Sequence, residues 1–237
     1  MGSTLGKHWQ RLKRSLNRRV KEFLLPRGYI RLGSRYGGWW LDSRMLTPNP
    51  LLIDCGLGED ISFPASFLKK FGGRVVGVEP NPRSLKYCKN IVPNTMRVIP
   101  QAFWSESGNT LTFHLPRPQE QLPKGADGVS GSILDSHVYV GDKAISVETI
   151  SFAEILKQEQ RTECDVLKMD IEGAEYKVLE ALCTSGDITL AKQLLVEFHH
   201  GVTTYSVADT ERAVSVLHDK NFKLIHTEGR NYIFRRL

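Results

Sequence analysis

The sequence has 237 residues, 41% hydrophobic and 24% charged, which is the composition of a globular protein with one substantial core. No apolar run approaches the roughly 20 residues that span a bilayer, and the N-terminus lacks the apolar stretch of a secretory signal. The four cysteines have no metal-ligand spacing, so we expect free thiols and a cytoplasmic location.

The net charge of +6 is unevenly distributed. Residues 1–35 contain ten Lys or Arg and one acidic residue, a local charge of +9, so the rest of the chain carries −3. Apolar residues recur every three or four positions from Leu5 to Phe23, which predicts a basic amphipathic helix. We expect it to pack on the protein's own surface, while peripheral membrane contact through residues 5–24 stays open. We therefore separate an N-terminal segment, 1–35, from a domain, 36–237.

Short apolar runs alternate with helical patterns from Leu51 onward. The runs predict strands over 51–55, 74–79, 96–99, 165–170 and 193–198, and the helical patterns predict helices over 60–71, 83–91, 151–160, 173–183 and 207–219. Strands that alternate with helices indicate a doubly wound α/β sheet. Two closing strands, 222–227 and 231–236, form a hairpin, which adds antiparallel pairing at one edge of that sheet.

The segment 105–149 is less regular and rich in Gly, Pro and Ser. We expect a hairpin arm near 110–115 and a strand at 145–147. Ser151, with Glu154 three residues later, predicts a capping box at the start of the next helix.

The first predicted strand ends in a glycine turn, Asp54-Cys55-Gly56-Leu57-Gly58. In open α/β sheets ligands bind at the carboxyl ends of the strands, and glycines there allow the backbone to approach a ligand closely. The third glycine of a dinucleotide-binding turn is absent, and Glu59 and Asp60 would repel a phosphate. The turn therefore favours a cationic or zwitterionic ligand such as S-adenosylmethionine.

Glu79 ends the second strand, about 20 residues further on, where an acidic residue binds the hydroxyls of a ribose. Alone it would equally be an exposed acid at a strand end, but its pairing with the glycine turn favours the cofactor role. Asn81 and Ala102, near the ends of the second and third strands, complete the predicted cofactor residues. An aromatic side chain at Phe103 or Trp104 either flanks an adenine ring or belongs to the core.

The segment LKMDIEGAEYKVL, residues 167–179, places three carboxylates after the fourth strand. We expect Asp170 and Glu172 to face the crevice, where they would orient the ammonium group of the cofactor, bind a substrate hydroxyl or act as general base. Glu175 falls in the first turn of the next helix, where a carboxylate is favourable, and we interpret it as helix capping.

The fifth strand ends in Glu197-Phe198-His199-His200. A neutral imidazole is a reasonable base for a hydroxyl proton, and we place His199 slightly ahead of Asp170 in that role. Solvated loop histidines are the alternative. Asp170, Glu172, Glu197 and His199 also have the donor atoms of a Mg²⁺ or Mn²⁺ site, but no spacing dictates one, and no metal is predicted.

These motifs resemble the FkbM-type methyltransferases. The most specific match is KMDIEGAE (168–175), and the segments IDCGLGEDISF, GVEPNP and LLVEFH occur in the expected order around it. The resemblance covers about residues 36–237 and implies a class I methyltransferase (Rossmann-like) fold and S-adenosylmethionine as cofactor. The acidic GEDISF turn departs from the more apolar turn of many relatives.

By motif match, the resemblance assigns functions to several residues. It implies that the cofactor is bound by Asp54, Gly56, Gly58 and Glu79. It also implies that Asp170 and Glu172 line the active crevice. Ser130 and Ser132 match a serine-containing segment of the family, for which the resemblance gives no role. The family implies methyl transfer to a hydroxyl of a sugar, glycan or natural-product small molecule.

Two other functions remain open. An RNA methyltransferase would use the basic N-terminal segment as its anchor, but the net negative domain disfavours nucleic acid. A non-catalytic protein that keeps the fold would not bind S-adenosylmethionine. Neither the acceptor nor the oligomeric state follows from the sequence.

Overall fold

The computed structural model describes residues 27–89, 91–93, 95–123 and 128–237. The amphipathic helix predicted between Leu5 and Phe23, and with it the proposed membrane contact, lies outside these residues. Within the described part of the chain, no helix combines the length and apolarity needed to cross a membrane.

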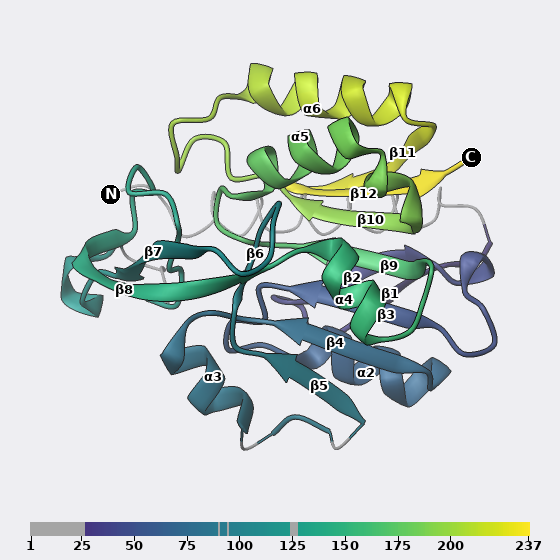
Figure 1. Ribbon diagram of the computed structural model, residues 1–237, viewed down its shortest axis with the longest axis horizontal. Helices are drawn as coiled ribbons and strands as arrows, with labels where there is room; N and C mark the ends of the chain where they lie inside the picture. The colour runs from purple at the N-terminus through teal and green to yellow at the C-terminus, as the bar shows by residue number, and fades with distance from the viewer. Residues whose placement is uncertain (1–26, 90, 94, 124–127) are drawn as a thin grey trace, which may run out of the picture.

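A seven-stranded sheet forms the centre of the molecule (Figure 1). Its spatial order is β11-β12-β10-β9-β3-β4-β5. In chain order these strands are β3 (Leu51–Cys55), β4 (Arg74–Val78), β5 (Met96–Ile99), β9 (Cys164–Met169), β10 (Ala191–Glu197), β11 (Phe222–Glu228) and β12 (Asn231–Arg236).

The predicted doubly wound α/β sheet is confirmed. Strands β5, β4, β3, β9 and β10 pair in parallel, and β12 pairs antiparallel with both β10 and β11. The closing hairpin folds back, so the last strand of the chain inserts between β10 and β11. Because the central strands are parallel, their carboxyl ends lie along one edge of the sheet, where ligands bind in such folds.

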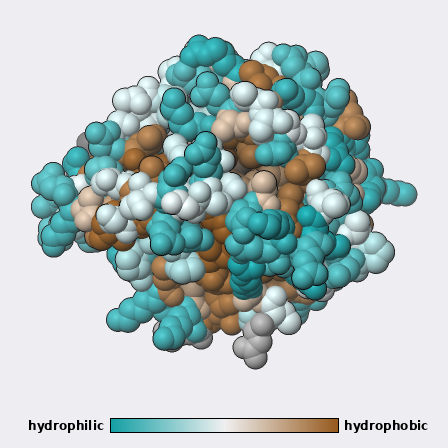
Figure 2. All heavy atoms as spheres, viewed as in Figure 1, coloured by the Kyte–Doolittle hydropathy of each residue, from teal (hydrophilic) through white to brown (hydrophobic). Residues whose placement is uncertain are grey.

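Helices cover both faces of this sheet. They are α2 (Ser62–Phe71), α3 (Pro82–Lys89), α4 (Phe152–Gln158), α5 (Glu175–Ser185) and α6 (Val207–Asp219). Buried side chains of α4, α5 and α6 belong to one core cluster, and those of α2 and α3 to another. Hydrophilic residues dominate the outer surface in Figure 2, with apolar residues visible near the middle of that face.

A hairpin of β1 (Tyr29–Leu32) and β2 (Trp39–Asp42) packs with the second core cluster. Trp39 and Trp40 of β2 are buried. The Gln193 side chain of β10 ties the hairpin to the sheet, since it accepts from Asp42 N at 2.7 Å and donates to Asp42 O at 3.1 Å. The hairpin spans the predicted boundary between residues 35 and 36, so residues 29–35 pack with the domain.

The irregular segment forms a separate three-stranded arm of β6 (Ala102–Phe103), β7 (Thr110–Pro116) and β8 (Val140–Ile150). The predicted strand at 145–147 is therefore too short. Only half of the predicted capping box forms: Ser151 Oγ accepts from Glu154 N, whereas Ser151 N donates to Ser107 Oγ. The arm projects beyond the carboxyl edge of the sheet and brings the loop between β7 and β8 back over it (Figure 1).

We expect Gln193→Leu to destabilise the fold by at least about 2 kcal/mol, because each unpaired buried backbone group costs about 1–3 kcal/mol. The free energy of unfolding, measured in urea, checks this. The exposed Gln121→Leu is the matched control, and equal stabilities of the two variants would contradict the anchoring role of Gln193.

Candidate functional site

The glycine turn after β3 meets the end of β9. Gly56 has φ +83°, and a Cβ atom on it would lie 1.7 Å from the carbonyl oxygen of Asp170. Gly58 N donates to the Glu79 carboxylate at 2.9 Å, so the turn is also tied to the end of β4. Only glycine fits at position 56, and the turn, Asp170 and Glu79 are thereby held in one place.

A pocket of about 560 Å³ opens beside this turn. The predicted cofactor residues that line it are Gly56, Gly58, Glu79, Asn81 and Ala102, together with the predicted catalytic residues Asp170 and Glu172. Its volume lies within the roughly 300–1,000 Å³ of small-molecule sites. Asp54 is the one predicted cofactor residue that does not line it.

Asp54 instead pairs with a buried lysine that the sequence analysis did not single out. The Lys168 ammonium lies 2.9 Å from Asp54 Oδ1 and donates to Gly56 O at 2.7 Å, and it reaches to 3.7 Å from Asp170 Oδ2. Burial lowers the pKa of Lys168, but the carboxylates of Asp54 and Asp170 outweigh it and raise that pKa well above its ordinary value. Lys168 is therefore a charged group that joins β3, β9 and the glycine turn.

Glu79 and Asn81 are fixed by backbone contacts. The Glu79 carboxylate accepts from Asn81 N at 2.7 Å as well as from Gly58 N, and the Asn81 amide donates to Val129 O at 3.1 Å. Burial raises the pKa of Glu79, and these backbone donors oppose the rise. The Glu79 carboxylate thus has a defined orientation in the pocket wall before any ligand arrives.

Of the two aromatic residues considered for a ring contact, Phe103 belongs to the core and also lines the pocket, whereas Trp104 is partly buried against the core and does not line it. Ser84 also lines the pocket, and its buried hydroxyl has no hydrogen-bond partner. An unsatisfied buried hydroxyl in a pocket wall is a ready contact for a polar ligand group.

A second pocket, of about 590 Å³, adjoins the first. The two share Tyr36, Gly37, Trp39, Ser130, Asp170 and Glu172. His199, Glu197 and Tyr139 line only the second pocket. Asp170 and Glu172 therefore stand where the two pockets meet, and His199 faces the second one.

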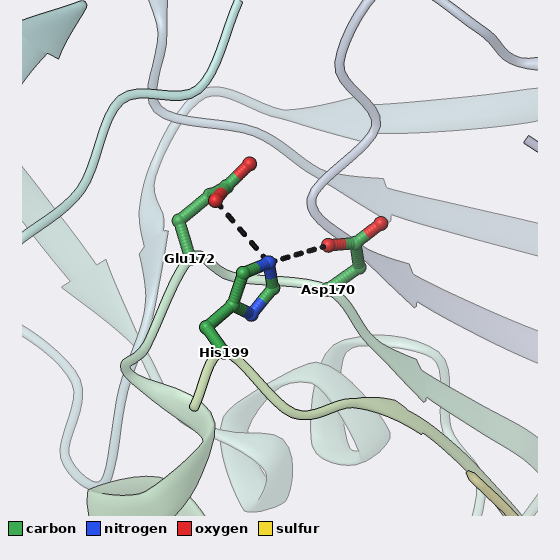
Figure 3. A group of neighbouring side chains, drawn as sticks. All are labelled: Asp170, Glu172 and His199. Carbon is green, nitrogen blue, oxygen red and sulfur yellow. Dashed lines mark ion pairs between the residues drawn. The ribbon is translucent and has the colours of Figure 1, made fainter. Parts of the chain in front are cut away.

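The three predicted catalytic side chains come together at this junction (Figure 3). His199 Nε2 lies 3.2 Å from Glu172 Oε2 and 3.6 Å from Asp170 Oδ1. The two carboxylates come from the loop after β9 and the imidazole from the loop after β10, so neighbouring parallel strands supply them all. Glu197 Oε1, at the end of β10, is 3.9 Å from the same nitrogen.

The position of Glu175 differs from its interpretation as a helix cap. Its carboxylate is fully buried and accepts from Gly173 N and His199 N, each at 2.8 Å, and it lies 3.0 Å from His199 Nδ1. It does not simply cap α5. It fixes the backbone and the ring of His199, so that Nε2 faces Asp170 and Glu172.

The loop between β7 and β8 supports Glu172 from above. Glu172 has φ +54°, an uncommon conformation for a residue other than glycine. Ser132 Oγ donates to Glu172 O at 2.7 Å, and His137 Nε2 lies 2.9 Å from Glu172 Oε2. Strained backbone of this kind concentrates at functional sites. His137 was not predicted as a site residue.

The charges in the cluster shift one another. Burial and the nearby Glu197 carboxylate raise the pKa of Asp170 to about 7. Burial would raise the pKa of Glu172, but the His199 charge outweighs it and lowers that pKa to about 2. Burial would lower the pKa of His199, but Glu175 and Glu172 raise it to about 10. The surrounding carboxylates thus favour the protonated form of His199, whereas a base needs the neutral form.

Comparison with known families gives one extensive match. The model of the methyltransferase FkbM domain matches residues 54–224, which is most of the chain. The matched range contains the glycine turn, the carboxyl ends of β3, β4, β9 and β10, and the Asp170–Glu172–His199 cluster.

Individual relatives are more distant. A rat protein described as probable methyltransferase-like protein 24 is 32% identical over 101 residues, which are 39% of this chain and only 28% of that protein. The solved structure of Aeropyrum pernix fibrillarin with natively bound S-adenosyl-L-methionine has a TM-score of 0.42 and 13% identity over 81% of this chain and 66% of that one. The human methyltransferase 10 domain containing protein has a TM-score of 0.43 and 13% identity over 82% of this chain and 73% of that one. At such TM-scores these likenesses say nothing about the acceptor.

We expect Gly56→Ala to destabilise the protein more than Gly108→Ala. Both glycines have positive φ, but a Cβ at Gly108 would meet nothing within 4 Å. The Gly108 variant should lose about 1–2 kcal/mol from conformation alone, and the Gly56 variant more, because of the clash with Asp170 O. Urea unfolding of both variants measures the difference, and equal losses would contradict the close approach of the two loops.

We expect Lys168→Met to cost about 3–5 kcal/mol of stability, because it leaves Asp54 buried without its partner. The double variant Asp54→Asn, Lys168→Met should recover part of this loss, since it removes the uncompensated charge. Unfolding free energies of the single and double variants test the pairing. A double variant less stable than Lys168→Met alone would show that the ion pair is not what Lys168 contributes.

Proposed function

The chain belongs to the FkbM methyltransferase domain family, and from this premise we propose that it methylates a hydroxyl group of a small molecule or sugar, with S-adenosylmethionine as methyl donor. The observation that carries the proposal is the meeting of two pockets at Asp170 and Glu172. One pocket would hold the donor and the other the acceptor, so that the two reacting atoms face each other at the junction.

The first pocket fits S-adenosylmethionine by its charge. Its charged lining consists of Glu59, Asp60, Glu79, Asp170 and Glu172, with Lys168 as the cation. An excess of carboxylates suits a ligand with a sulfonium and an ammonium group and no phosphate. Glu79, held by two backbone donors, would accept hydrogen bonds from the ribose hydroxyls. Phe103 would contact the adenine ring.

The second pocket suits an acceptor rich in hydroxyl groups. Trp39 and Tyr139 offer aromatic faces to a ring, and Glu197 and Asn231 offer polar atoms. The Arg230 guanidinium pairs with Glu197 at 2.8 Å and holds it in the wall. Carboxylates that line a pocket accept hydrogen bonds from hydroxyl groups and orient them.

Bound S-adenosylmethionine supplies an electrophilic methyl group on sulfur. An acceptor hydroxyl that takes this methyl group would have to give up its proton to the protein. Asp170 and Glu172 both border the two pockets, and Asp170, whose pKa is raised to about 7, is the more basic of the two carboxylates and would take that proton. Glu172 and His199 would fix the acceptor hydroxyl beside it. Thus we now place Asp170 ahead of His199 as the base.

We expect two variants to separate cofactor binding from transfer. Glu79→Gln should weaken S-adenosylmethionine binding at least about tenfold, because a charge-assisted hydrogen bond contributes about 1.5–3 kcal/mol. His199→Gln should bind the cofactor like the wild type, since His199 lines only the second pocket, but should lose methyl transfer. Calorimetric titration measures the first effect, and release of S-adenosylhomocysteine with a panel of sugars and hydroxylated small molecules measures the second.

A folded wild-type protein that fails to bind S-adenosylmethionine would contradict the proposal. If the protein binds the cofactor and methylates RNA, but none of the sugars or hydroxylated small molecules, then RNA is the acceptor class instead. Full transfer by His199→Gln would exclude the junction from the chemistry.

A further inference from the structure

Both nitrogens of the His199 ring are directed at carboxylates. Nδ1 lies 3.0 Å from Glu175 Oε1, and an ionised carboxylate only accepts hydrogen bonds, so Nδ1 carries a proton. The other nitrogen, Nε2, then directs its lone pair at Glu172 and Asp170 in any neutral ring. A lone pair that faces two carboxylates is unfavourable, so Nε2 either carries a proton and pairs with them or faces a cation bound between them.

Carboxylates outnumber the cations around this point. Asp170, Glu172 and Glu197 each approach Nε2 within 3.9 Å. Arg230 pairs with Glu197, and Lys168 lies closer to Asp54, at 2.9 Å, than to Asp170, at 3.7 Å. Partly buried carboxylates need a charged partner or a metal ion. The cationic partner that Asp170 and Glu172 have in common is His199.

His137 provides an independent sign of a polar occupant. Its side chain is fully buried, and its Nδ1 accepts from Tyr139 N at 3.2 Å, so Nε2 carries the proton in the neutral ring. That N–H lies 2.9 Å from Glu172 Oε2, and within the described residues it makes no well-formed hydrogen bond. Buried donors without a partner are few in native proteins, and a ligand is one common reason for them.

We propose that Asp170, Glu172 and His199 bind a divalent transition-metal cation at the junction of the two pockets. One carboxylate oxygen from each acid and His199 Nε2 would be the ligands, and such atoms of the three residues lie within 4.8 Å of one another. Two oxygens and an imidazole nitrogen suit Mn²⁺, Fe²⁺ or Zn²⁺. The ligands come from the ends of two packed strands, so the site is formed before the ion binds.

Glu175 would orient His199 in such a site. A histidine that binds a metal through one ring nitrogen usually donates its other N–H to a carboxylate, which fixes the tautomer and the ring. The buried Glu175 carboxylate does this for His199, and it also accepts from the backbone N of the same residue. Glu175 would therefore be a positioning residue, without contact to the ion.

The role of the cation in methyl transfer rests on the function proposed above, whereas the existence of the cation site does not. An ion at the junction would bind the acceptor hydroxyl and lower its pKa, which reduces the demand on Asp170 as base. Acceptors with two adjacent oxygens would be favoured, because both oxygens reach the same ion.

Titration of the full chain with Mn²⁺, followed by electron paramagnetic resonance of the free ion, tests the site. The wild type should bind a single Mn²⁺ ion, and Asp170→Asn, Glu172→Gln and His199→Gln should each abolish the binding. Glu175→Gln should weaken it about 10–100-fold, as expected for a residue that orients a metal-binding histidine. Glu180→Gln, an exposed carboxylate on the same helix as Glu175, is the matched control and should bind like the wild type. Circular dichroism of each variant establishes that it is folded.

S-adenosylmethionine binding, measured on the same samples, separates this inference from the proposed function. If the folded wild type binds S-adenosylmethionine but no Mn²⁺ or Zn²⁺, the cation site is wrong and the function is unaffected. Mn²⁺ binding that survives in all three ligand variants also overturns the site. Mn²⁺ binding without S-adenosylmethionine binding supports the site and contradicts the function.

Discussion

One buried ammonium group joins the strand ends on which the site is built. Lys168 lies among Asp54, the carbonyl oxygen of Gly56 and Asp170, and thus holds β3, β9 and the glycine turn together. A buried charge without partners would be costly, so the geometry of these groups is tightly fixed. The close approach of Gly56 to Asp170 depends on this arrangement, and so does the junction of the two pockets at Asp170.

The chemistry at the junction follows from sheet topology. Adjacent parallel strands end at the same edge, so the loops after β9 and β10 place two carboxylates and an imidazole around one point. The β7–β8 arm then covers this point and adds His137 and the serine contacts to Glu172. The sheet thus supplies the two carboxylates and the imidazole of the cluster, and the arm covers them.

Much of the fold could be predicted because buried parallel strands are short apolar runs bounded by turn residues. The run at 51–55 and the helical pattern at 207–219 match β3 and α6 residue for residue. The β1–β2 hairpin was missed, because Tyr36-Gly37-Gly38 before Trp39 has the composition of a turn with no strand pattern. Strand β8 was predicted too short, since Gly141, Asp142 and Lys143 do not favour a strand, and its pairing with β7 decides the outcome.

The site was predictable where its residues end strands, as with Glu79, Asp170 and His199. Glu175 was misinterpreted because a first-turn carboxylate already has a sufficient local reason, and only tertiary packing shows that it is buried against His199. Lys168 did leave a signal, namely a charged residue between the apolar Leu167 and Met169 of a predicted buried strand. His137 left none, since it lies in an irregular loop whose path depends on the whole arm.

The most direct test is a crystal structure of the protein with S-adenosylhomocysteine and Mn²⁺, recorded with anomalous scattering from manganese. We predict that S-adenosylhomocysteine lies beside the glycine turn, with its ribose hydroxyls on Glu79, and that an anomalous peak lies between Asp170, Glu172 and His199. S-adenosylhomocysteine in the second pocket, or an anomalous peak away from this cluster, would contradict it.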